Sequence, residues 1–88
     1  MRIHIMRSST HPVEYAVVIV VWREGRWHTV RTFDNAHDAE EHHEHGYIGA
    51  EKQPPTVTHG PVNEAMHAAT VMARRSWADI VDAWERMQ

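Results

Sequence analysis

The sequence YAVVIVVW occupies Tyr15–Trp22, and WHTVRTFD follows at Trp27–Asp34. Both stretches are rich in β-branched and aromatic residues, which favour strands. The connection between them contains Glu24 and Gly25, and Gly25 can adopt the positive φ that a two-residue hairpin turn requires. The sequence therefore predicts an antiparallel hairpin with strands at 15–22 and 27–34.

Both faces of this hairpin are apolar, whereas a hairpin with one face in water would alternate apolar and polar residues. The expected turn sets three pairs opposite each other: Trp22 with Trp27, Ile19 with Val30, and Ala16 with Phe33. One face then carries Ala16, Val18, Val20, Trp22, Trp27 and Phe33, and the other carries Tyr15, Val17, Ile19, Val21 and Val30. We expect the protein's own helix to cover one face. A further element or a second subunit would cover the other, so a homodimer is predicted.

A long helix is predicted over about 61–87. Pro61 suits the first helical turn, and the charge of Glu64 complements the positive end of the helix. Apolar residues recur along it at steps of three and four: Val62, Met66, Ala69, Ala73, Trp77, Ile80, Trp84 and Met87. Such a stripe packs against a sheet. The expected fold class is therefore α+β, with one domain over residues 1–88 and a small antiparallel sheet packed by one C-terminal helix.

The remaining segments give weaker signals. Arg2–Met6 alternates and is interpreted as an edge strand, and Thr56–Thr58 as a brief extended stretch, for three to four strands in all. Residues 35–46 have two interpretations. They form either a short helix, capped by Asn35 and ended by Gly46, or an acidic, histidine-rich loop.

Composition limits the classes of function. Nine Lys and Arg against twelve Asp and Glu give a net charge of −3, so a strong basic field for nucleic acid is absent. The chain has no cysteine, which excludes disulfides, thiolate metal sites and a cysteine nucleophile, and fits a cytoplasmic location. The longest apolar run, 16–22, is far shorter than the ~20 residues that cross a bilayer, so no membrane association is expected.

The unusual feature is nine histidines, four of which lie between residues 37 and 45. Histidine titrates near neutral pH and serves as a general acid or base. RNA cleavage needs one group to remove the 2′-OH proton, another to protonate the leaving oxygen, and a cation on the phosphate. Two of the clustered histidines with Arg31 would meet these needs, which makes a ribonuclease one candidate.

A metal site is the alternative chemistry for the same segment, because imidazole and carboxylate bind zinc and other divalent metals. If the segment is helical, Asp38, Glu41, His42 and His45 share one face. If it is extended, His43 and His45 share a side. A third interpretation is a solvated surface on a non-catalytic dimeric interaction or accessory protein, with no cofactor.

The order of these parts resembles a known family. A hairpin that ends in Phe33-Asp34-Asn35-Ala36-His37, the stretch His42-His43-Glu44-His45 and a C-terminal helix are similar to the TumE-like toxin components of toxin–antitoxin pairs. The resemblance spans about 15–87, with matching motifs in 33–45. It implies an α+β toxin fold, action on RNA and an antitoxin partner. The implied site residues are Asp34, Asn35, His37, His43 and His45.

Overall fold

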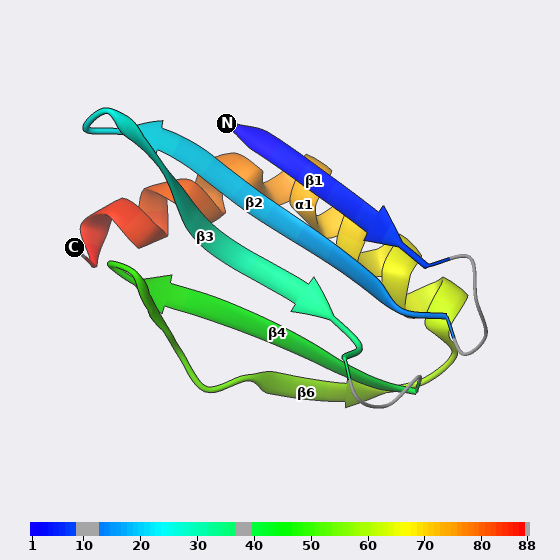
Figure 1. The fold of residues 1–88 in the computed structure, drawn as a ribbon. Coiled ribbons are helices and arrows are strands. Elements are labelled where there is room, and N and C mark those ends of the chain that lie inside the picture. Colours follow the sequence, from blue (N-terminus) through cyan, green and yellow to red (C-terminus); the bar gives the residue numbers. More distant parts are fainter. Residues whose placement is uncertain (9–12, 37–39, 88) are drawn as a thin grey trace.

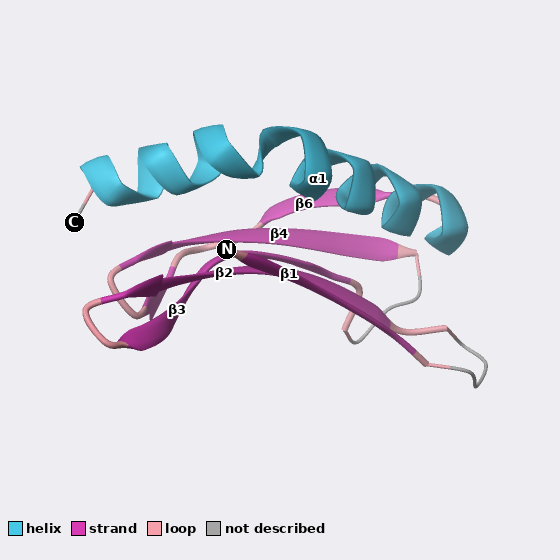
Figure 2. Cartoon of the chain, turned by 90° about the horizontal axis from the view of Figure 1, so that it is seen from above, coloured by secondary structure: helices cyan, strands magenta, loops and turns pink. Residues whose placement is uncertain are grey.

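The computed structural model describes residues 1–8, 13–36 and 40–87. These residues form six strands and one helix, in two layers (Figures 1 and 2). The elements are β1 (Arg2–Arg7), β2 (Tyr15–Arg23), β3 (Arg26–Asp34), β4 (Glu41–Ile48), β5 (Glu51–Lys52), β6 (Thr56–His59) and α1 (Val62–Arg86). The expected α+β class is confirmed, but the sheet has more strands than the three to four predicted.

The sheet is antiparallel, in the order β1-β2-β3-β4, and β4 pairs on its other side with both β5 and β6. The predicted edge strand is present as β1, which pairs only with β2 among the described residues. The predicted hairpin is β2–β3, with Glu24 and Gly25 at φ of 53° and 78°. These two positive values are typical of the turn that matches strand twist.

The hairpin register differs from the predicted one beyond its first pairs. Trp22 does lie opposite Trp27, but a β-bulge between Ile19 and Val20 shifts the rest. Ile19 therefore faces Arg31 rather than Val30, Val17 faces Phe33, and Ala16 faces Asp34. Because a shift of one residue reverses the face of every following side chain, Phe33 lies on the helix side and not on the outer side.

One face of the sheet packs against α1, and this layer contains the core. The buried side chains come from alternate positions of β2, from β3 and from the apolar stripe of α1: Tyr15, Val17, Ile19, Val21, Val30, Phe33, Ala69, Ala73, Ile80, Val81 and Trp84. The helix runs from Val62 to Arg86 with Pro61 at its N-cap, close to the predicted bounds. Trp77 and Met87, however, are 37% and 59% exposed and do not join this core.

The other face of the sheet, here called the outer face, carries no helix in the described part of the chain (Figure 2). On its β1–β2 half, Ala16, Val18 and Val20 are half-buried and Met6 and Trp22 about half exposed, with Arg2 and His4 opposite Val20 and Val18. Its other half, on β3, β4 and β6, carries most of the polar side chains discussed below. None of the described helices is long and apolar enough to cross a membrane.

Residues 41–46, the second half of the segment 35–46, belong to strand β4 and form neither the short helix nor the loop that the sequence suggested. Its residues 43–46 pair with β3, and its residues 41–44 pair with β6. Backbone pairing on both sides outweighs the local preference of Glu for helix. The helix-forming Ala39 of this segment lies outside the described residues.

Candidate functional site

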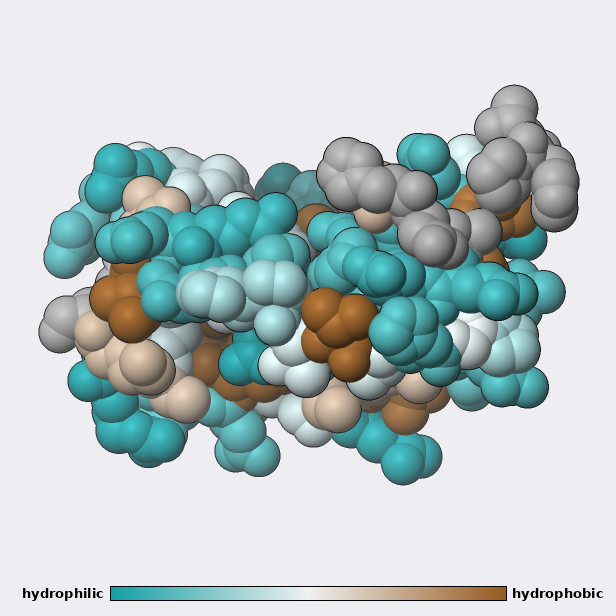
Figure 3. All heavy atoms as spheres, turned by 90° about the horizontal axis from the view of Figure 1, so that it is seen from below, coloured by the Kyte–Doolittle hydropathy of each residue, from teal (hydrophilic) through white to brown (hydrophobic). Residues whose placement is uncertain are grey.

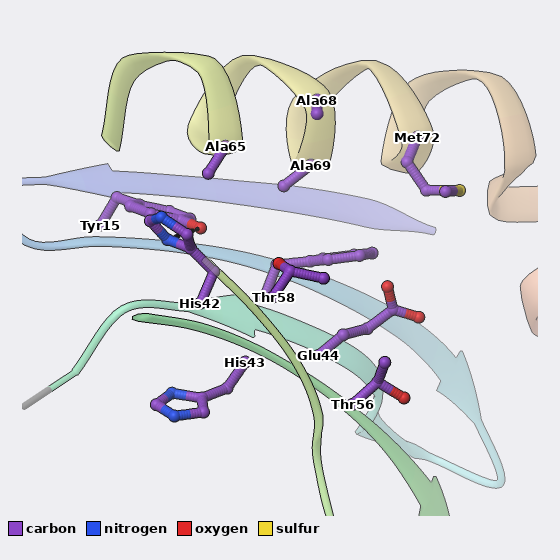
Figure 4. A pocket seen from close by; sticks show the side chains of 11 residues that line it. Tyr15, His42, His43, Glu44, Thr56, Thr58, Ala65, Ala68, Ala69 and Met72 are labelled. Carbon is purple, nitrogen blue, oxygen red and sulfur yellow. Dashed lines mark hydrogen bonds between the residues drawn. The ribbon is translucent and has the colours of Figure 1, made fainter. Parts of the chain in front are cut away.

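Strand β4 separates the clustered histidines by alternation. Successive side chains of a strand point to opposite faces, so His42 and Glu44 point toward α1, while Glu41, His43 and His45 lie on the outer face. Figure 4 shows His42 directed toward the helix and His43 directed away from it. The predicted interpretation for an extended segment, with His43 and His45 on one side, is therefore the one that the structure contains.

His43 lies between two carboxylates. Its Nε2 is 2.9 Å from Glu41 Oε1, and its Nδ1 is 3.3 Å from Asp34 Oδ1. Both ring nitrogens thus face carboxylate oxygens, and the charged imidazolium is the form that can donate to both at once. The hydrogen bond to Glu41 and, after it, the contacts with Asp34 raise the pKa of His43 above its usual 6.5, although partial burial opposes them. These contacts therefore favour the protonated, proton-donating form of His43.

His45 has the complementary arrangement. Its Nδ1 is 2.8 Å from the backbone carbonyl of Gln53, which can only accept a hydrogen bond. Nδ1 therefore carries the proton, and in the neutral ring the lone pair lies on Nε2. The His43 and His45 ring centroids are 6.2 Å apart. Two neighbouring imidazoles on one surface thus have different partners: carboxylates favour a proton on each nitrogen of His43, and the Gln53 carbonyl favours a proton on His45 Nδ1.

Asp34 and Asn35 have different roles, although the family resemblance groups them. Asp34 lies on the outer face, where Oδ1 faces His43 and also the Ala36 N–H, at 3.4 Å. Asn35 is 1% exposed, and its amide accepts from the Tyr15 N–H and donates to the Val13 carbonyl. Asp34 is therefore a partner of the histidine pair, whereas Asn35 holds the start of β2 and does not reach the outer face.

Arg31 is not the phosphate-binding cation that the sequence suggested. The bulge places it on the helix side, where its guanidinium bonds Glu44 at 2.5 Å. Since His43 and His45 occupy the opposite face, Arg31 cannot contact a substrate bound between them. The same shift of one residue brings Asp34 to the outer face, so a carboxylate lies where a cation was expected.

The predicted metal set is not assembled. It required a helix to align its members, but in the strand His42 lies on the face opposite Glu41 and His45. In the part of the chain that the structure describes, no group of three or more His, Asp or Glu side chains is arranged to hold a metal ion. His37 and Asp38, from the acid–base and metal sets respectively, lie outside the described residues.

His42 is a structural residue. It is 5% exposed; its Nε2 is 2.8 Å from the Gly60 carbonyl, and its Nδ1 is 3.0 Å from the Tyr15 hydroxyl. Burial, together with the negative charge of Asp34, raises the pKa of Tyr15, so the phenol stays protonated. Its O–H donates a hydrogen bond to His42 Nδ1. His42 thus joins β2 and β4 to the start of α1.

A cavity of about 160 Å³ lies beside His42, between β4, β6 and the first half of α1 (Figure 4). Its walls include Phe33, Ala69 and Met72. Two of the polar side chains that line it already have partners, since His42 bonds Tyr15 and Glu44 bonds Arg31. This cavity therefore offers less chemistry than the outer face.

Two further side chains belong to the network of the histidine pair. Glu41 is the principal partner of His43, although the sequence suggested it only as a metal ligand. His59, 71% exposed on β6, extends the network because its Nε2 is 3.7 Å from the other oxygen of Glu41. The alternation of Glu41, His43 and His45 was the available signal for the first of these.

Seen from the β6 side, the surface is largely hydrophilic with separate hydrophobic patches (Figure 3). Comparison with known proteins identifies no related chain: no family model matches, and neither a curated protein nor a solved structure is significantly similar. The candidate site therefore rests on its own geometry.

Proposed function

We propose that this protein is a toxin-like enzyme that cleaves RNA, with His43 and His45 as its general acid–base pair. The observation that carries the proposal is the difference in hydrogen-bond partners between two imidazoles 6.2 Å apart. His43 is held as a proton donor by Glu41 and Asp34, and the Gln53 carbonyl leaves His45 Nε2 as an acceptor. Phosphodiester cleavage by the adjacent hydroxyl requires one of each.

The chemistry assigns one proton transfer to each ring. His45 Nε2 removes the proton from the ribose 2′-OH as that oxygen attacks phosphorus. An N–H of His43 then protonates the departing 5′-oxygen, which leaves a 2′,3′-cyclic phosphate. Glu41 and Asp34 act through His43, because their negative charge keeps its proton in place above the usual imidazole range.

Cleavage of a single-stranded RNA oligonucleotide tests this proposal. The double variant His43→Ala/His45→Ala is expected to lose at least ~10²-fold in rate, the usual scale of general acid–base catalysis. His67→Ala, which changes an exposed histidine of α1, is the matched control and should cleave like the unaltered protein. A double variant as active as the unaltered protein would overturn the assignment.

Two further properties distinguish this chemistry from the metal alternative. Cleavage should persist in a chelator, because neither proton transfer involves a metal ion. Replacing the ribose at the cleaved position by 2′-deoxyribose should abolish it, because the attacking hydroxyl is then missing. If a chelator abolishes the activity and added zinc restores it, a metal site would be favoured instead.

The resemblance to toxin components extends the proposal to a cytoplasmic location and an antitoxin partner. Expression of the unaltered chain is then expected to arrest growth, and the double variant should not. Co-purification with a protein encoded by the adjacent gene would identify the antitoxin.

A second candidate function is that of a non-catalytic dimeric interaction protein. The observation that favours it is the group of apolar side chains on the β1–β2 half of the outer face, where Met6 and Trp22 are 53% and 52% exposed. Pairing of two copies through this half would bury these side chains. Sedimentation at tens of micromolar should then give about twice the 10.2 kDa mass, and Val18→Lys should give a monomer. A monomer for the unaltered chain would exclude this dimer.

A further inference from the structure

A second cleft opens beside the histidine pair, where β3 and β4 separate. The two strands pair only over Arg31–Asp34 and His43–Gly46. The first half of β3 remains paired with β2 and diverges from the end of β4, as Figure 1 shows. The resulting cleft has a volume of about 240 Å³. The bulge in the β2–β3 pair accompanies this change of direction, as bulges commonly do.

The cleft has aromatic residues on both of the strands that form it. Trp27 comes from β3, and Tyr47 from β4. Trp27 is held by an edge-to-face contact with Trp22, at 5.5 Å between centroids, and by the Arg2 guanidinium 4.6 Å from its ring. Tyr47 is half-buried against the core. Both residues thus have packing contacts within the protein and also line the cleft.

Polar groups complete the lining. They are Arg26, His28 and Thr29 on β3, and Gly49 and Ala50 of the turn after β4 also line the cleft. A flat aromatic ligand with hydrogen-bonding groups can stack on the aromatic residues and bond to the polar ones, and a nucleobase has this chemistry. Aromatic side chains that stack on unpaired bases are the usual means by which proteins bind single strands.

The position of the cleft links it to the histidine pair. His43, His45 and Tyr47 occupy alternate positions of β4, so Tyr47 follows His45 by about 7 Å along the strand. An extended RNA strand whose sugar-phosphate lies at the two histidines can therefore place a neighbouring base at Tyr47.

We infer that the Trp27–Tyr47 cleft binds an unpaired nucleobase of single-stranded RNA and positions the adjoining phosphodiester at His43 and His45. The inference rests on the proposed function for its substrate class and adds how that substrate is held. A base inside a duplex cannot enter the cleft, because its faces are covered by stacking neighbours. Single strands are thus the substrate, and duplexes are not.

Binding without cleavage gives the most direct test. The background is the full chain with His43→Ala/His45→Ala, and the probe is a fluorescently labelled RNA hexanucleotide followed by anisotropy. Adding Trp27→Ala is expected to raise Kd about tenfold or more, the scale of one lost stacking contact. Trp27→Phe keeps a ring and should recover most of the affinity. Trp77→Ala, a helix tryptophan 37% exposed against 42% for Trp27, is the matched control and should change nothing.

An abasic hexamer of equal charge separates stacking from electrostatics. It should bind weakly, and equally to the proteins with and without Trp27. Equal Kd values for the RNA hexamer with Trp27 and with Trp27→Ala, or an abasic hexamer bound as tightly as the RNA, would overturn the inference. Absence of any RNA binding would overturn it as well.

The experiments distinguish a failure of the base-binding cleft from a failure of the proposed acid–base pair. If Trp27 governs binding but the unaltered chain does not cleave RNA, the cleft stands and the catalytic assignment falls. If the unaltered chain cleaves RNA and Trp27→Ala changes neither Kd nor KM, the cleft assignment falls and the catalytic one stands.

Discussion

His42 and His43 are adjacent in the sequence, yet they lie in opposite layers of the molecule. His42 is buried under α1 and joins two strands to the helix through Tyr15 and Gly60. His43 lies on the outer face between two carboxylates. The same side chain is thus a structural residue on the inner face and a candidate acid on the outer one. The face of the strand, rather than the density of histidines, determines the role.

The largest effect that this comparison predicts is a difference in stability between variants that lack a tryptophan of the inner face and variants that lack one of the outer face. Trp84 is 7% exposed in the inner layer, and its ring lies 5.5 Å from that of His28. Trp84→Ala should cost about 3–5 kcal/mol in the free energy of unfolding, because it leaves a cavity in the core. Trp22→Ala, on the outer face, should cost less than about 1 kcal/mol. Chemical denaturation of both variants measures the difference, and equal costs would contradict the layer assignment.

The next effect concerns the two histidines themselves. His42→Ala removes the ring at the centre of a buried network and leaves both of its partners, the Tyr15 hydroxyl and the Gly60 carbonyl, without that hydrogen bond. The expected cost is about 2–4 kcal/mol. His43→Ala should change the free energy of unfolding by less than about 1 kcal/mol near neutral pH. If the two substitutions prove equally destabilising under urea, the distinction between the histidines is wrong.

The smallest effect is a pH dependence that belongs to His43 alone. Because contacts with Glu41 and Asp34 raise its pKa in the folded chain, the stabilisation is fully present below the unfolded value of 6.5 while both carboxylates are ionised. It disappears as the pH rises through the raised folded value. The stability advantage of the unaltered chain over His43→Gln should thus be larger at about pH 6 than at about pH 9. Thermal or urea unfolding at both pH values checks this, and an advantage that grows with pH would refute it.

Local signals predicted most of the fold. The β-branched run of β2, the Glu24-Gly25 turn and the apolar steps of α1 each follow from neighbouring residues. The bulge does not, because it is a feature of the pairing between two strands and not of the local preference of either one. Its consequences are large: it moves Phe33 and Arg31 to the helix side and brings Asp34 to the outer face.

Strand β4 was missed for a related reason. Its residues include good helix formers and many histidines, and its pairing partners lie in β3 and β6, at a distance in the sequence. The candidate site was therefore predicted only in part. His43, His45 and Asp34 follow from the chemistry of the segment, whereas the support from Glu41 and the structural role of His42 depend on alternation along a strand that the sequence did not reveal.

The proton positions on the imidazole rings test the central claim most directly. Nitrogen-15 NMR of histidine side chains distinguishes the charged ring from each neutral form. We predict that His43 remains protonated on both nitrogens above pH 6.5, that neutral His45 carries its proton on Nδ1, and that His42 carries its proton on Nε2. A His43 that is already neutral below pH 6.5, or a neutral His45 protonated on Nε2, would contradict the acid–base pair on the outer face.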